Sequence, residues 1–168
     1  MFCIFCGGAA EGTVTLRCGG CGRTHYLNSK ISSSALVVRG GDYLVARRAV
    51  EPELGKWDLP GGFCEYGEDP AVTAARETLE ETGAEVTIDR LLGVWMEEYV
   101  EPDGRPWPTL ALVYAARLDD PSAGPAIASP AANDEISELR WVPLASPLAD
   151  MAFAKQQRGA IAIYVRER

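Results

Sequence analysis

"RETLEETG", residues 76–83, places three glutamates, Glu77, Glu80 and Glu81, within five positions of the chain. In an α-helix, spacings of three and four residues bring these carboxylates to one face. Like charges at such spacings destabilise a helix by roughly 0.2–0.5 kcal/mol per pair. A bound cation would relieve this repulsion, so the cluster itself raises the hypothesis of a metal site.

Helix signals flank this stretch on both sides. Asp69 is a typical N-cap residue, Pro70 suits the first helical position, and Gly83 suits a helix end. The sequence therefore predicts a helix between Asp69 and Gly83. With a step of about 100° per residue, Val72 and Leu79 fall opposite the carboxylates, and we predict that they pack on a sheet.

An acidic helix face exposed to solvent is the ordinary alternative, with Arg76 pairing with Glu80 one turn away. Two features favour a ligand instead. The segment "LPGG" (59–62) precedes the helix, and its glycines let the backbone turn tightly and approach a ligand. Small residues, Thr73 and Ala74, flank the acidic face. Hard divalent cations prefer carboxylate and carbonyl oxygens, so the pattern favours a magnesium-type site.

The polar and glycine positions of this region have a fixed spacing: Gly62, five residues, Glu68, seven residues, and then "RETLEETG". This pattern resembles the Nudix box, G-x5-E-x7-R-E-U-x-E-E-x-G-U, the signature of Nudix hydrolases. Thr78 and Ala84 depart from it, because a larger aliphatic residue is usual at both positions. Seven matching positions at fixed spacing are a strong signal. The stretch from about residue 34 to residue 142 also follows the family's element order.

The resemblance implies an α/β/α sandwich with a mixed sheet. It also implies Mg²⁺- or Mn²⁺-dependent hydrolysis of a nucleoside diphosphate linked to another group. By position, the metal ligands would be the carboxylates of Glu77, Glu80 and Glu81, helped by the backbone carbonyl of Gly61.

Glu68 and Arg76 would form an ion pair that orients these ligands. A metal lowers the pKa of bound water, and a carboxylate then takes the proton. Our first choice for this base is Glu80 or Glu81. The second is Glu135, in the loop before the last expected strand, where a glutamate resembles the additional ligand or base of several relatives. An exposed loop acid is an equally good interpretation of Glu135.

The rest of the chain predicts the remaining elements. Two strands joined by a turn at Gly40-Gly41 are expected within residues 34–49. Further strands are expected at 91–100, 109–118 and 138–144. Residues 119–134, rich in Pro, Ala and Ser, predict a flexible surface insertion. Residues 146–168 predict a helix with a break at Gly159.

Four of the five cysteines lie in the first 21 residues as two Cys-x2-Cys pairs, each followed by glycine. Four thiolates in a tetrahedron select Zn²⁺. Two disulfides are the alternative, but they need an oxidising compartment, which the sequence does not support. The sequence thus predicts a zinc ribbon over residues 1–30, with His25 as a packing or hydrogen-bonding residue. The four expected zinc ligands are Cys3, Cys6, Cys18 and Cys21.

A zinc ribbon ahead of a Nudix domain, here expected over residues 31–168, resembles a subgroup that hydrolyses NADH, FAD or ADP-ribose. The segment "CGRTHYLNSK" (21–30) is similar to the join between the two modules in that subgroup. The NADH pyrophosphatases carry "SQPWPFPxS" after the box, whereas this chain has "GRPWPTLAL" (104–112). Only Pro-Trp-Pro is shared, so NADH is not assigned as the substrate.

The formal net charge of −8 argues against non-specific binding to nucleic acid or to an anionic membrane. The N-terminus lacks the pattern of a secretory signal, and no window has the roughly 18 apolar residues of a membrane helix. We therefore expect a cytoplasmic protein. The sequence leaves open whether the ribbon braces the domain or forms a homodimer contact.

Aromatic rings can stack on a nucleotide, and cationic groups can bind its phosphates. For each candidate near the expected cleft, a core or surface role is the alternative. The expected substrate contacts are Arg47, Arg48, Lys56, Trp57, Tyr66 and Trp107, with Trp95 and Tyr99 as further aromatics.

Two other functions remain open. One is hydrolysis of a nucleoside triphosphate or a diadenosine polyphosphate. The other is a non-catalytic nucleotide sensor or adaptor, although such proteins tend to lose box carboxylates and this chain keeps them all.

Overall fold

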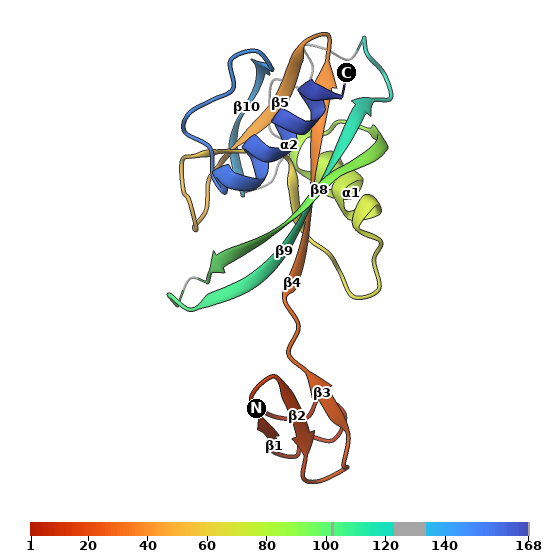
Figure 1. Ribbon diagram of the computed structural model, residues 1–168, viewed down its shortest axis with the longest axis vertical. Helices are drawn as coiled ribbons and strands as arrows, with labels where there is room; N and C mark the ends of the chain where they lie inside the picture. Colours follow the sequence, from red (N-terminus) through yellow and green to blue (C-terminus); the bar gives the residue numbers. More distant parts are fainter. Residues whose placement is uncertain (102, 123–133, 168) are drawn as a thin grey trace.

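The computed structural model describes residues 1–101, 103–122 and 134–167. Its strands form two sheets, and Figure 1 shows the small one lying apart from the rest of the molecule. The small sheet consists of β1 (Ala10–Gly12), β2 (Thr15–Cys18) and β3 (Thr24–Tyr26). The large sheet consists of β4 (Lys30–Arg39), β5 (Asp42–Arg48), β6 (Trp57–Asp58), β7 (Gly61–Phe63), β8 (Val86–Val100), β9 (Pro106–Leu118) and β10 (Ile136–Pro143). The two helices are α1 (Pro70–Thr82) and α2 (Ala154–Arg166).

The large sheet is mixed. Its main path runs β10-β5-β4-β9-β8, while β6 pairs with β5 and β7 pairs with β4. Strands β4 and β9 are parallel, and the other pairs are antiparallel. The hairpin between β4 and β5 turns at Gly40-Gly41, as the sequence predicts.

Successive side chains of β4 point to opposite faces of the sheet, and each face has its own core. Leu36 belongs to the cluster that contains Ala160 and Ile161 of α2. Its neighbours Ala35 and Val37 belong to the cluster that contains Ala74 of α1. The helices therefore cover opposite faces of the sheet, which confirms the predicted α/β/α sandwich (Figure 1).

Helix α1 has the predicted ends. The Asp69 side chain accepts a hydrogen bond from the Ala71 N–H, Pro70 opens the helix, and Gly83 ends it in the left-handed region at φ 71°. The predicted packing face was wrong, because Val72 and Leu79 are exposed.

The buried side chains of α1 are small or acidic instead: Thr73, Ala74, Thr78, Glu81 and Thr82. The prediction placed the packing face opposite all three carboxylates, whereas Glu81 itself is buried. Glu81 faces the interior of the domain beside β7, while Glu77 is partly buried and Glu80 is exposed.

The C-terminal helix is shorter than predicted and has no break. Residues 146–153 precede it without forming a helix or a strand, and α2 passes through Gly159 without interruption. A Cβ atom on Gly159 would lie 2.9 Å from Trp95, so glycine is needed there for close packing against β8. Trp95 is partly buried and packs against the core, and it does not line the main cavity described below.

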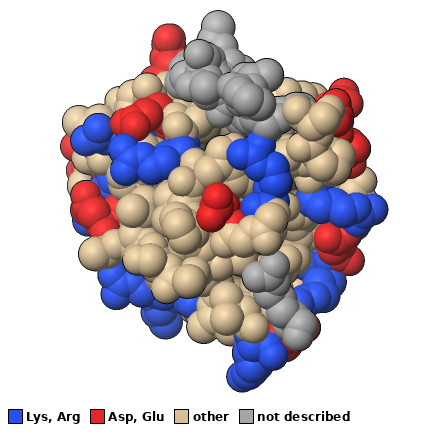
Figure 2. Space-filling model, turned by 90° about the horizontal axis from the view of Figure 1, so that it is seen from above, with Lys and Arg blue, Asp and Glu red and all other residues tan. Residues whose placement is uncertain are grey.

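The predicted insertion at 119–134 lies largely outside the described residues, since 123–133 belong to no described range. Strands β8 and β9 are both longer than predicted. Figure 2 shows Lys and Arg interspersed with Asp and Glu at the end of the molecule away from the small sheet. Neither described helix is both long and apolar enough to cross a membrane.

Candidate active site

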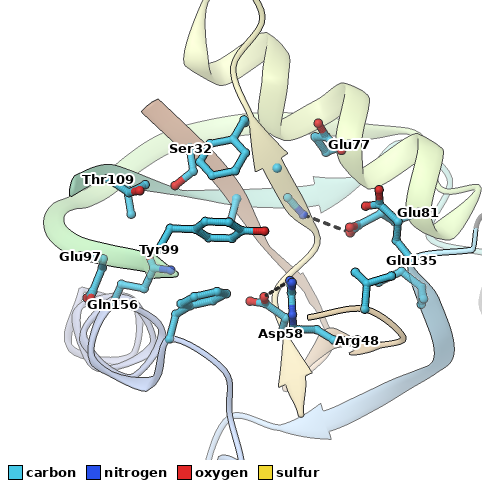
Figure 3. A pocket seen from close by; sticks show the side chains of 18 of the residues that line it. Ser32, Arg48, Asp58, Glu77, Glu81, Glu97, Tyr99, Thr109, Glu135 and Gln156 are labelled. Atoms are coloured by element: carbon cyan, nitrogen blue, oxygen red, sulfur yellow. Dashed lines mark hydrogen bonds and ion pairs between the residues drawn. The ribbon is translucent and has the colours of Figure 1, made fainter. Parts of the chain in front are cut away.

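A cavity of about 660 Å³ opens beside α1, a size usual for small-molecule sites. Both helices and most strands of the large sheet contribute to its wall (Figure 3). Seven residues expected from the sequence to act on the substrate or its metal line this cavity: Arg48, Gly61, Glu77, Glu80, Glu81, Tyr99 and Glu135.

Glu81 is the most buried carboxylate of the group, with 6% of its surface exposed. Its Oε2 accepts a hydrogen bond of 3.1 Å from the Gly61 N–H. Burial is the main reason that the pKa of Glu81 is raised to about 9, and the nearby negative charges of Asp58, Glu77 and Glu135 contribute to this rise. A carboxylate in this environment binds either a proton or a cation readily.

Arg76 connects the acidic residues. Its Nε and Nη2 donate to the two oxygens of Glu68 at 2.8 and 3.0 Å, a bidentate ion pair. Its Nη1 donates to Glu77 at 2.9 Å and to Glu80 at 3.0 Å. One guanidinium therefore fixes three carboxylates, as the expected orienting role requires.

Glu68 is held by more than Arg76. It also accepts hydrogen bonds from the Thr73 hydroxyl at 2.8 Å and from the Glu65 N–H at 3.0 Å. The bond from Arg76, followed by these two, lowers the pKa of Glu68 to about 2. Glu68 thus stays ionised and keeps Arg76 in place.

The two glycines of "LPGG" allow a close approach of other parts of the protein, rather than of a ligand as the sequence suggested. Gly61 and Gly62 lie in β7 and pair with Ser34 and Ser33 of β4. A Cβ atom on Gly62 would lie 2.5 Å from the carboxylate of Glu77. Gly62 therefore leaves the space that the Glu77 carboxylate occupies.

The chemistry of this donor set fits Mg²⁺ or Mn²⁺. Glu77, Glu80 and Glu81 offer hard oxygens on one wall of the cavity. Burial raises the pKa of Glu77, and the negative charges of Glu80 and Glu135 add to this effect despite Arg76. Among the described residues, however, only the four cysteines form a set of ligand atoms within 4.8 Å of one another. The carboxylates are more widely spaced, which suits an ion that keeps part of its water shell.

The four cysteine thiols converge in the N-terminal unit and form no disulfide. The Sγ atoms of Cys3 and Cys21 lie 3.7 Å apart, and those of Cys6 and Cys18 lie 3.5 Å apart. A tetrahedron with Zn–S bonds of about 2.3 Å has S–S edges of roughly 3.8 Å. The thiol geometry therefore fits zinc.

Two further contacts complete the thiol cluster. The Cys21 N–H donates to Cys18 Sγ at 3.4 Å, which lowers the pKa of Cys18 to about 6. His25 Nε2 lies 3.2 Å from Cys3 Sγ. This contact agrees with the expectation that His25 hydrogen-bonds to the cluster rather than completing it.

The expected substrate contacts are dispersed. Arg48 lines the cavity and pairs with Asp58 at 3.3 Å. Trp57 lies in the core at 7% exposure, and Tyr66 is fully exposed. Trp107 lines a separate shallow pocket with Lys30.

Neither Arg47 nor Lys56 lines the main cavity described here. Arg47 donates to the Gly55 carbonyl at 2.9 Å, and Lys56 pairs with Glu53.

Several residues in or beside the cavity were not predicted from the sequence. Asp58 follows Trp57 in a stretch that looked like a strand and loop, and burial raises its pKa to about 6. Gln157 donates to Asp58 from α2. A pair of glutamines on an otherwise apolar helix face was the available signal, whereas Phe153 and Glu97 gave none.

The comparisons agree with this architecture. The NUDIX domain model matches residues 29–162, so the chain belongs to the Nudix family. A crystal structure of a NUDIX hydrolase from Nitrosomonas europaea superposes with a TM-score of 0.76 at 29% identity, covering 99% of this chain and 91% of the other.

Two curated relatives show how far the similarity extends. A MutT-like protein of Streptomyces ambofaciens is 46% identical over 66 residues, 39% of this chain and 41% of the relative. The NAD-capped RNA hydrolase NudC of Stutzerimonas stutzeri is 29% identical over 99% of this chain and 56% of the relative. The matched part of this chain thus spans about half the length of these relatives.

Proposed function

We propose that the protein hydrolyses a nucleoside diphosphate linked to another group, and that it requires Mg²⁺ or Mn²⁺. The observation that carries this proposal is the buried carboxylate of Glu81 in the cavity wall. It lies beside Glu77, whose carboxylate is fixed by Arg76. Such a set concentrates negative charge where a cation would bridge to a diphosphate.

Glu77, Glu80, Glu81 and the Gly61 carbonyl would hold the ion. When bound, it neutralises the diphosphate and lowers the pKa of an attacking water. Arg76 and Glu68 position the ligands through the bidentate pair described above. Glu80 or Glu81 takes the proton from the water, and Glu135, which lines the same cavity, is the second candidate.

The substrate class that we infer is a dinucleotide or nucleotide-sugar pyrophosphate, such as ADP-ribose, FAD or NADH. A relative that aligns over 99% of this chain is named a NAD-capped RNA hydrolase, which supports a dinucleotide link. Among the expected cationic residues, Arg48 has the best position to contact phosphate, since it lines the cavity.

We further propose that residues 1–30 form a zinc ribbon and residues 31–168 the hydrolase domain. The thiol geometry supports the first assignment. The two sheets are hydrogen-bonded separately and β4 starts at Lys30, which supports a boundary close to residue 30.

Replacing Glu81 tests the proposal directly. With Mg²⁺ present, the wild-type protein should release AMP from ADP-ribose, and Glu81→Gln should lower turnover about a thousandfold, the effect of removing a group that acts in the transition state. Glu85→Gln is the matched control, because Glu85 is exposed just beyond the same helix. Equal turnover in the two variants would refute the assigned role. Near-wild-type thermal unfolding would show that Glu81→Gln is folded.

A further inference from the structure

One end of the cavity carries two hydrogen-bond acceptors that have no partner among the described residues. They are Oε1 of Glu97, on β8, and Oε1 of Gln156, on α2. Both side chains line the cavity, and Gln156 is 94% buried, with 6% of its surface exposed. Buried polar atoms are rarely left unpaired, so two in one wall point to a ligand that donates hydrogen bonds.

This end lies away from the expected metal ligands. In Figure 3, Glu97 and Gln156 lie on one side of the cavity, and Glu77 and Glu81 lie on the other. Tyr99 lies between the two groups. A nucleotide whose phosphates contact the acidic side would therefore extend its base toward Glu97 and Gln156.

Aromatic rings line the same space. Tyr99 and Phe153 are stacked, with their centroids 6.3 Å apart and an interplanar angle of 21°. Phe63 meets Tyr99 edge to face at 5.1 Å. Phe153 has φ 45°, a left-handed conformation that is costly for a residue other than glycine. These rings offer the flat apolar surface on which a base stacks.

We propose that Glu97 and Gln156, together with the Tyr99 and Phe153 rings, form a subsite for an aminopurine base. The inference rests on the proposed function, since it takes the phosphates to lie at the acidic side. Two unpaired acceptors require N–H donors, and adenine and guanine both carry an exocyclic amino group. Hypoxanthine lacks that group and offers only its N1–H at this edge, while the single N3–H of uracil lies between two carbonyl oxygens that would repel the Glu97 carboxylate. Cytosine also carries an amino group, but purines offer more stacking surface than pyrimidines do.

Binding of nucleoside monophosphates in the presence of Mg²⁺ tests the subsite by calorimetry. At least one of AMP and GMP should bind about tenfold or more tightly than IMP and UMP, as expected for a site that loses a base contact. Equal affinity for all four nucleotides, within about twofold, would overturn the proposal.

Variants assign this preference to the two acceptors. Glu97→Met and Gln156→Met remove an acceptor at similar side-chain volume, and each should reduce the preference to about threefold or less. Glu85→Met is the matched control, since Glu85 is exposed and does not line the cavity, and it should keep the full preference. If Glu97→Met keeps the full base preference, the inference is refuted. If Gln156→Met does not fold, the result for Glu97→Met alone decides the question.

The outcomes separate this inference from the proposed function. Hydrolysis of ADP-glucose, GDP-glucose and UDP-glucose at equal rates would sustain the hydrolase and refute the subsite. Base-selective binding without hydrolysis of any substrate would sustain the subsite and refute the hydrolase.

Discussion

The cysteine cluster and the carboxylate cluster are opposite designs for holding a cation. The four thiols lie within 4.8 Å of one another in residues 1–30, where only Cys3, Ala10, Leu16 and Cys18 are buried apolar residues. The carboxylates of α1 are spaced along the cavity wall, in a domain with a core on each face of its sheet.

The difference indicates what each ion would do. A unit with so small a core depends on its ligands for stability, and four converging thiolates leave no position for substrate. The sandwich domain is stable through apolar packing, so its acidic residues are free to serve chemistry. We therefore expect removal of metal to unfold the first unit and to inactivate, but not unfold, the second.

The largest expected effect is the loss of zinc from the N-terminal unit. Cys18→Ser should abolish zinc binding, which contributes on the order of 10 kcal/mol in small zinc modules. Zinc content by elemental analysis should fall from about one per chain to near zero. Amide exchange should become fast in residues 1–30 and stay slow in β4 and β9. Unfolding of the whole chain would contradict the contrast between the two regions.

Replacing Arg76 by Lys should have a smaller effect, confined to activity. Lysine keeps the charge but cannot form the bidentate pair with Glu68 while also reaching Glu77 and Glu80. Turnover should fall about 10- to 100-fold, the usual cost of losing a group that orients ligands. Steady-state kinetics at saturating Mg²⁺ checks this, and unchanged turnover would remove Arg76 from its positioning role.

The smallest expected effect is a pH dependence of stability from Asp58. Its carboxyl is buried, and its pKa is raised to about 6 in the folded protein, mainly by desolvation. Between about pH 4 and 6 the unfolded chain releases this proton while the folded chain keeps it. The free energy of unfolding therefore falls as pH rises through this range, by on the order of 1–3 kcal/mol.

The Asp58→Asn variant has no carboxyl group at this position, so its free energy of unfolding should fall less over the same pH interval. Urea unfolding of both proteins in EDTA at about pH 4 and pH 7 provides the comparison. Identical pH dependence of the two proteins would show that Asp58 has an ordinary pKa.

Local signals in the sequence were sufficient to predict most of the fold. Asp69, Pro70 and Gly83 fixed the ends of α1 because caps act within one turn. The spacing of the box residues placed Glu77, Glu80 and Glu81 on the cavity wall.

Features that depend on packing between distant segments were not accessible from the sequence. Val72 and Leu79 lie on the exposed side of α1 because the interior accepts Glu81 instead. Helix α2 continues through Gly159 because Trp95, on a distant strand, fills the space beside it. Likewise, Glu97 and Gln156 come to one cavity only when β8 and α2 pack together.

The central claim is tested most directly by a calorimetric titration of the intact protein with Mn²⁺ in the presence of a non-hydrolysable nucleotide. We expect the wild-type protein and Glu85→Gln to bind the ion alike, and Glu81→Gln to bind it at least tenfold more weakly. Equal affinity in all three proteins, or no uptake by any of them, would contradict the claim that the acidic face of α1 holds a cation.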